Sequence, residues 1–257
     1  MHLMAVTKVL VGCCGLSGLS LKKYAQNFNV IELQSTFYQL PQIETAQRWR
    51  EEVGDDFEFS IKAFQGITHP ITSPTWRRAG SQRPTEDVDK YGHLNPTPQN
   101  FRCWEETMAI CKVLRSRVCV VQLPSSFTCT DDNVNRMIRF FKSVEKPEVL
   151  AIEVRGESWF ERPSILKRAL EEINGIHIVD PLVRRSVLES KVAYFRLHGL
   201  GKRLYDYRYT DDDLERLIEV LQSMESLECY VMFNNLYAKD DATRFKRLLK
   251  DQKFSFK

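Results

Sequence analysis

The sequence lacks any hydrophobic run long enough to cross a membrane. Its longest apolar runs, residues 118–123 and 192–197, have the length of strands, whereas a membrane-spanning helix needs roughly 20 apolar residues. The N-terminal residues 1–10 also lack the apolar segment and small-residue cleavage site of a signal peptide. We therefore expect no membrane association and a cytoplasmic location.

A large excess of charge of either sign is absent as well. The 37 Lys and Arg residues nearly balance 34 Asp and Glu, for a net charge of +3. This balance does not indicate nucleic-acid binding, but it is compatible with a local anion site.

The seven cysteines show no disulfide or zinc pattern. Their number is odd, and Cys119 and Cys229 fall within apolar, strand-like runs, which favours buried free thiols. Cys13 and Cys14 are adjacent, so on a strand their side chains point to opposite faces and cannot both bind one metal ion. We therefore expect no structural zinc site.

Motifs for nucleotides and cofactors are also missing. The chain has no Gly-rich phosphate loop, nucleophile elbow or Rossmann fingerprint, which argues against nucleotide-driven and dinucleotide-dependent chemistry. It has only five histidines and no closely spaced ligand motif, so we predict no cofactor. A divalent metal remains the alternative. Its candidate ligands would be Glu32, His69, Glu153, Asp180 and His198.

Short β-branched runs alternate along the chain with segments of helical periodicity. This alternation is typical of βαβ units in a parallel sheet, and about 250 residues is a common size for an α/β barrel. We predict a single TIM (β/α)8 barrel domain over residues 1–257. The expected strands are residues 8–13, 30–33, 57–63, 118–123, 149–154, 177–179, 192–197 and 230–233.

Apolar stripes at helical spacing predict helices around Tyr24, Trp104, Met137 and Leu217. Capping residues mark where helices should begin. These are Ser20, Thr130, Thr210 and, as a first helical residue, Pro163. The segment after the sixth strand is short, so we expect the sixth helix to be one or two turns or absent and the barrel to be irregular there.

One segment interrupts this alternation, a long insertion at about residues 68–100 after the third strand. It combines several prolines with Arg77, Arg78 and Arg83 and has little apolar periodicity, which predicts a loop. A loop that follows a barrel strand lies at the C-terminal face, where such insertions are commonly functional or mobile.

Polar residues end or follow almost every predicted strand, where TIM barrels build their active sites. In chain order they are Glu32, Lys62, His69, Gln122, Glu153, Arg155, Asp180, Arg196, His198, Asn234 and Asn235. Because isolated buried charges cost several kcal/mol each, these residues must pair or meet a ligand. We predict a functional site. The alternative is a structural layer of ion pairs, such as Glu32 with Lys62 or Glu153 with Arg196.

These residue types suit two chemical roles. The predicted catalytic residues are Glu32, Glu153, Asp180 and His198. Carboxylates and imidazoles transfer protons when their surroundings push their pKa values apart. The predicted substrate-binding and anion-binding residues are Lys62, His69, Gln122, Arg155, Arg196, Asn234 and Asn235. Guanidinium groups bind phosphate or carboxylate in bidentate fashion, so a small anionic ligand is the expected partner.

Distinctive sequence blocks lie along nearly the whole chain. They are VGCCGL, NVIELQSTFYQLP, Arg48–Trp49, FEFSIKAFQGITHP, VQLPSSF, AIEVRGESWF, YFRLHG and VMFNN. Together these blocks resemble the YecE-like family of TIM-barrel proteins, which has no assigned biochemical role. The family commonly has Ser-Gly-Trp where this chain has Cys14, Gly15 and Leu16, so an aromatic side chain is missing at that corner. The resemblance implies a barrel and a shared polar site, without implying a reaction.

The leading functional hypothesis is an enzyme, a hydrolase or an isomerase, that acts on a small phosphorylated or sugar-like anion by general acid/base catalysis. A second hypothesis is a metal-dependent phosphodiesterase or nuclease. In that case the loop residues Trp76, Arg77, Arg78, Arg83 and Tyr91 would track a nucleic-acid backbone. A third is a non-catalytic ligand-binding barrel.

Overall fold

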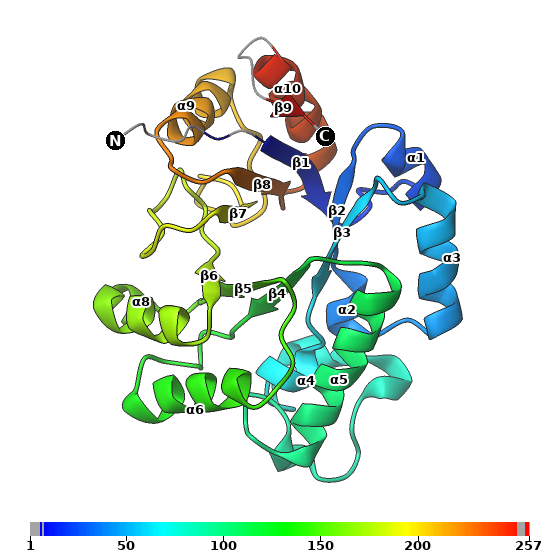
Figure 1. Cartoon of the computed structure of the whole chain (residues 1–257), viewed down its shortest axis with the longest axis vertical. Coiled ribbons are helices and arrows are strands. Elements are labelled where there is room, and N and C mark those ends of the chain that lie inside the picture. Colours follow the sequence, from blue (N-terminus) through cyan, green and yellow to red (C-terminus); the bar gives the residue numbers. More distant parts are fainter. Residues whose placement is uncertain (1–5, 7, 251–254, 257) are drawn as a thin grey trace. The chain divides into compact units, whose positions relative to one another are not determined.

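A computed structural model describes residue 6 and residues 8–250 and 255–256. The described chain divides into two compact units. The terminal unit comprises the described residues up to Glu32, Glu52–Glu58 and the described residues from Ile176 onward. The central unit comprises Leu33–Glu51 and Phe59–Gly175. Strands and helices alternate along both units (Figure 1).

The sheet of the terminal unit is parallel. Its strands, in hydrogen-bonded order, are β2 (Val30–Leu33), β1 (Lys8–Cys14), β8 (Glu228–Phe233) and β7 (Val192–Leu197). A further strand, β9 (Ser255–Phe256), pairs with β1. The register places Cys14 opposite Glu32 and Arg196 opposite Met232.

Helices follow the strands of the terminal unit. They are α1 (Leu21–Ala25), α9 (Asp211–Gln222) and α10 (Ala238–Lys250). Helix α10 packs against β1 and β8, and its buried residues include Ala242, Phe245 and Leu249. Apolar side chains of α10 therefore cover strands β1 and β8.

The central unit also has a parallel sheet. Strands β3 (Glu58–Lys62), β4 (Val118–Gln122) and β5 (Val149–Glu153) are hydrogen-bonded in that order. Its helices are α2 (Ser35–Tyr38), α3 (Ile43–Val53), α4 (Gln65–Thr68), α5 (Pro98–Val113), α6 (Asp131–Lys142), α7 (Glu157–Phe160) and α8 (Pro163–Glu172). One of the points where the chain passes between the units falls within β6 (Gly175–His177).

The predicted helix starts are confirmed by their hydrogen bonds. Ser20 and Thr130 accept bonds from the backbone three residues on, and Thr210 forms a reciprocal capping box with Asp213. Pro163 begins α8, where its missing N–H costs no helical bond. Local sequence chemistry therefore determines where these helices begin.

The structure differs from the sequence expectation at the sixth strand. The β-branched run predicted residues 177–179, but β6 covers Gly175–His177 and Val179 forms only an isolated bridge with Phe195. The prediction was wrong by two residues because backbone pairing, not β-branched composition, defines a strand. As expected, no helix lies between β6 and β7 in this described stretch.

Helices α3 and α10 were not identified from apolar stripes. Helix α3 buries only Ala46 and Arg50, which leaves few apolar positions to mark a helical period. Helix α10 buries Phe245 and Leu249 as well as Ala238, Asp241 and Ala242, so an apolar stripe at helical spacing was available in its sequence.

Of the insertion expected at residues 68–100, residues 69–97 lie between α4 and α5 and contain short 3₁₀ helices. These are η1 (Pro74–Arg78), η2 (Gly80–Gln82) and η3 (Val88–Lys90). Trp76 anchors the loop because its side chain is 1 % exposed and its indole N–H donates to the backbone carbonyls of His69 and Pro70.

No described helix has the length and apolar character needed to span a membrane. Residues 1–5 and 7, part of the segment used to predict the absence of a signal peptide, lie outside the described residues.

Candidate functional site

A buried ion pair joins β2 and β7 in the terminal unit. A guanidinium nitrogen of Arg196 lies 3.0 Å from Glu32 Oε1, and the two side chains are 1 % and 0 % exposed. The Tyr194 hydroxyl donates to Glu32 Oε2 at 3.0 Å. The sequence predicted Glu32 and Arg196 but missed Tyr194. Its spacing of two residues from Arg196, which puts both on one face of the strand, was the available signal.

Cys14, at the end of β1, lies beside this ion pair. Burial, and then the charge of Glu32, raise the pKa of the Cys14 thiol well above its usual value of 9.0, while Arg196 opposes the shift. A thiol with a raised pKa stays protonated at neutral pH and is a poor nucleophile. Cys14 is therefore a neutral neighbour of the pair.

Asp180 follows β6 and holds the chain near the end of β7. Its Oδ1 accepts the backbone N–H of Leu182 at 3.1 Å, and its Oδ2 accepts the backbone N–H of His198 at 3.2 Å. The Tyr209 hydroxyl, which the sequence did not single out, lies 3.4 Å from Oδ2. Burial raises the pKa of Asp180 to about 6, although these hydrogen bonds oppose the shift. Asp180 can therefore exchange a proton near neutral pH.

His198 is 8 % exposed, and its ring contacts that of Tyr205 in the same unit, with 5.5 Å between centroids. Tyr205 is one of the few residues other than glycine with a positive φ, 72°. This left-handed conformation is strained for a bulky side chain, and it places the Tyr205 ring against the imidazole.

Asn235 holds two loops together. Its amide nitrogen donates to the Tyr207 carbonyl and to Asp241 Oδ2, both at 2.7 Å. The preceding Asn234 uses its backbone N–H to bond the Leu197 carbonyl. The contacts of Asn235 give it a role in positioning the loop after β7, and ligand binding by either asparagine stays a prediction.

In the central unit, Glu153 and Arg155 form an ion pair at the end of β5. An Arg155 guanidinium nitrogen lies 2.9 Å from Glu153 Oε1, with the side chains 23 % and 7 % exposed. The same guanidinium contacts Gln122 Oε1, at the end of β4, at 3.4 Å. The Arg155 side chain is partly exposed to solvent, so it can also bind a ligand.

Lys62 and His69 lie near one another around the ring of Phe37. The Lys62 ammonium is 4.0 Å from the centroid of that ring, and the His69 imidazole meets the ring edge-on at 4.9 Å. The Thr68 hydroxyl is 2.8 Å from His69 Nδ1. Burial first, and then the charges of Lys62, His93 and Arg155, lower the pKa of His69 to about 3. His69 is thus a neutral imidazole within a positive field.

His93 belongs to the same unit and was not predicted. Its Nε2 lies 3.0 Å from the Ser126 hydroxyl, and its backbone φ of 50° is left-handed. Burial, and then Arg136, lower the pKa of His93 below its usual 6.5. No strand periodicity marks a loop histidine, so the sequence offered no signal for it.

The predicted site residues thus divide between the units. Glu32, Asp180, Arg196, His198, Asn234 and Asn235 belong to the terminal unit, and Lys62, His69, Gln122, Glu153 and Arg155 belong to the central unit. Within the units, Glu32 pairs with Arg196 and Glu153 pairs with Arg155. That all of them form one site stays a prediction.

The alternatives for metal and nucleic-acid binding can be compared with this geometry. Within either unit, the described His, Cys, Asp and Glu side chains form no group of three or more that could hold a metal ion. Trp76 is buried against Phe64 and Tyr91, so it is not available to stack on a base. The aromatic part of the nucleic-acid hypothesis for the 68–100 loop was therefore wrong for Trp76.

Comparison with solved structures defines the class of the protein. The chain aligns with a xylose isomerase domain-containing protein of Salmonella typhimurium LT2 at a TM-score of 0.56 and 11 % identity, over 98 % of each chain. It aligns with a DUF72 family protein of Enterococcus faecalis V583 at a TM-score of 0.71 and 21 % identity, over 97 % of this chain and 99 % of that one. The protein is a TIM-barrel protein, as predicted.

The chain belongs to the family described as "Protein of unknown function DUF72", whose model matches residues 16–256. UPF0759 protein YunF of Bacillus subtilis (strain 168) is 25 % identical over 89 % of this chain and 85 % of its own length. UPF0759 protein YecE of Escherichia coli (strain K12) is 46 % identical over 50 residues, which are 20 % of this chain and 18 % of that protein. The predicted YecE-like resemblance is confirmed.

Proposed function

We propose that the protein is an enzyme that acts on a small anionic substrate, phosphorylated or sugar-like, by general acid/base catalysis. The observation that carries this proposal is the positive field in the central unit. After burial, which is the largest cause, the charges of Lys62 and Arg155 act on His69 and help to lower its pKa. A field that disfavours a further positive charge favours a negatively charged ligand.

The donors of this cluster are suited to an oxyanion. Arg155 offers guanidinium N–H groups, and Lys62 offers an ammonium held over the Phe37 ring. The neutral His69 can donate one ring N–H without adding charge. Guanidinium and ammonium groups together bind phosphate or carboxylate oxygens strongly because each hydrogen bond is charge-assisted.

Groups for proton transfer are available in each unit. Asp180 has a pKa of about 6, which is close to the value that a general acid or base needs near neutral pH. Glu153 pairs with Arg155 through Oε1, and a carboxylate beside a ligand-binding arginine is a second candidate. The proposed role of Asp180 does not depend on that of Glu153.

The names of two similar structures agree with a sugar-like substrate. One is the xylose isomerase domain-containing protein of Salmonella typhimurium LT2. The other is a D-allulose 3-epimerase of Methylomonas sp. in complex with D-allulose, with a TM-score of 0.53 and 12 % identity. Similarity at this level shows the fold alone, so it supports isomerase chemistry only by analogy.

The first experiment measures the melting temperature of the protein with inorganic phosphate, sugar phosphates, free sugars and divalent metal chlorides. A ligand at about 100 times its Kd stabilises by roughly 2.7 kcal/mol, which raises the Tm of a domain of this size by several degrees. We expect a rise with a sugar phosphate that Arg155→Gln abolishes. Arg168→Gln, an exposed arginine on α8, is the matched control and should keep the rise.

The other outcomes separate the alternatives. A shift with metal ions alone would favour the metal-dependent phosphodiesterase. A ligand that stabilises the protein and is never converted, in assays that follow the bound compound over hours, would favour a non-catalytic binding barrel. No shift with any anion would contradict the proposal.

The predicted cytoplasmic location is part of this proposal. All seven cysteines are free thiols, and all but Cys14 are buried. Free thiols are typical of a reducing compartment. Labelling of the native protein in intact cells and cell fractions would test the location.

A further inference from the structure

A cavity of about 920 Å³ lies in the central unit, beside α5. Its volume is within the range of small-molecule sites, about 300–1,000 Å³. Its walls come mainly from residues 40–43, from residues 81–91 of the 68–100 loop and from residues 98–110 at and after the start of α5. None of the residues predicted to bind substrate lines it, so the cavity is separate from the groups on which the proposed function rests.

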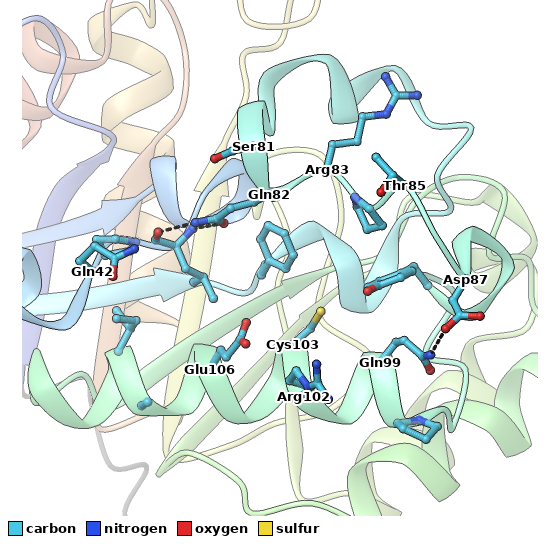
Figure 2. Close-up of a pocket in the computed structure, with 18 of the residues that line it drawn as sticks. Gln42, Ser81, Gln82, Arg83, Thr85, Asp87, Gln99, Arg102, Cys103 and Glu106 are labelled. Carbon is cyan, nitrogen blue, oxygen red and sulfur yellow. Dashed lines mark hydrogen bonds between the residues drawn. The ribbon is translucent and has the colours of Figure 1, made fainter.

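The loop wall of the cavity is held in place without a ligand. The Gln82 side chain accepts from the Leu40 backbone N–H and donates to the Leu40 carbonyl, both at 2.9 Å. Further along the same loop, Asp87 Oδ2 accepts a hydrogen bond from Gln99 Nε2 on α5 at 2.8 Å. Figure 2 shows both contacts as dashed lines. A preformed wall lowers the entropy that binding costs.

The floor of the cavity is apolar. Phe64, Cys103 and Ile110 line it and are 4 %, 6 % and 3 % exposed. Burial raises the pKa of Cys103 to about 12, so this sulfur remains a neutral thiol and the floor carries no charge. The floor would therefore receive the apolar part of a ligand.

Of the charged side chains that line the cavity, Arg102 and Glu106 lie one turn apart on α5, and the loop contributes Arg83, Glu86 and Asp87. Arg102 and Glu106 are both exposed, and residues four apart on a helix lie about 5–6 Å from each other at Cβ. Both charges act on Tyr91, whose pKa burial raises, Arg102 lowers and Glu106 raises. Among the described residues, neither Arg102 nor Glu106 has an ion-pair partner within 4.0 Å.

Figure 2 shows how these side chains are directed. Glu106 and Cys103 rise from α5 toward the loop, Arg102 lies close to the ribbon of α5 in this view, and Arg83 points away from them. We propose that this cavity binds a zwitterionic, amino-acid-like ligand. Its ammonium group lies at Glu106, its carboxylate at Arg102, and its apolar side chain on the floor around Phe64.

Three probes that share a phenylethyl group test this assignment by calorimetry. L-phenylalanine carries both charges, phenethylamine lacks the carboxylate, and 3-phenylpropionate lacks the ammonium. We expect L-phenylalanine to bind, and each truncated probe to bind at least about tenfold more weakly, because each loses a charge-assisted contact.

The variants separate the two charges. Glu106→Gln should weaken binding of L-phenylalanine and phenethylamine but not of 3-phenylpropionate. Arg102→Gln should weaken binding of L-phenylalanine and 3-phenylpropionate but not of phenethylamine. Glu105→Gln is the matched control, because Glu105 is exposed on the same helix and does not line this cavity. Phosphate binding at Lys62, His69 and Arg155 should be unchanged in all three variants. A failure of L-phenylalanine to bind in the cavity can therefore be distinguished from a failure of the proposed function.

Three results would overturn the inference. The first is the absence of L-phenylalanine binding at millimolar concentration. The second is binding of phenethylamine as tightly as L-phenylalanine, and the third is an equal effect of Glu106→Gln and Glu105→Gln. Either of the last two would mean that the paired charges on α5 do not select the ligand.

Discussion

Replacing Arg196 with methionine would leave the Glu32 carboxylate inside the terminal unit without its guanidinium partner. The arginine is 1 % exposed and the glutamate 0 % exposed, so water cannot replace the lost interaction. Breaking a buried pair by removing one partner costs about 3–5 kcal/mol. That is a large part of the roughly 5–15 kcal/mol by which native proteins are stable.

Two companion variants make this prediction specific. Tyr194→Phe removes one hydrogen bond to the same carboxylate and should cost about 1.5–3 kcal/mol. The double variant Glu32→Leu with Arg196→Met removes both charges. It should recover most of the loss, because apolar replacement of a whole buried pair is often neutral or stabilising.

Urea denaturation followed by tryptophan fluorescence measures these differences as shifts of the midpoint at constant slope. A loss below about 1 kcal/mol in Arg196→Met, or a double variant no more stable than this single variant, would refute the buried-pair reasoning.

Three further predictions follow from single groups. Because the pKa of Asp180 in the folded state is about 6, above its ordinary 3.8, the folded protein binds this proton more tightly than the unfolded chain. Stability should therefore fall by up to about 3 kcal/mol as the pH rises from 4 to 6, and urea denaturation of Asp180→Asn should lack this loss. With a pKa of about 3, His69 should show no imidazole titration between pH 5 and 8 by NMR; a midpoint near 6.5 would contradict its burial. Thr210→Ala removes the capping box of α9 and should cost about 1 kcal/mol, whereas Thr243→Ala, at an exposed helical position, should cost clearly less in the same denaturation assay.

The candidate site was predictable where strand periodicity applies. Glu153 and Arg155, and likewise Arg196 and His198, are two residues apart, and this spacing predicted that each pair shares a face. The ion pair between Glu153 and Arg155 agrees with that expectation. His93 was not predicted because a loop residue has no periodicity. Its contact with Ser126 depends on the tertiary position of the 68–100 loop.

Local chemistry in the sequence by itself determined the alternation of strands and helices and the capped helix starts at Ser20, Thr130 and Thr210. These features depend on side-chain alternation and on hydrogen bonds that span only a few residues. Only the tertiary structure decided that Arg196 pairs with Glu32, that Trp76 is buried, and that Arg102 and Glu106 face a cavity. Such contacts depend on which distant segments pack together, and no local pattern encodes them.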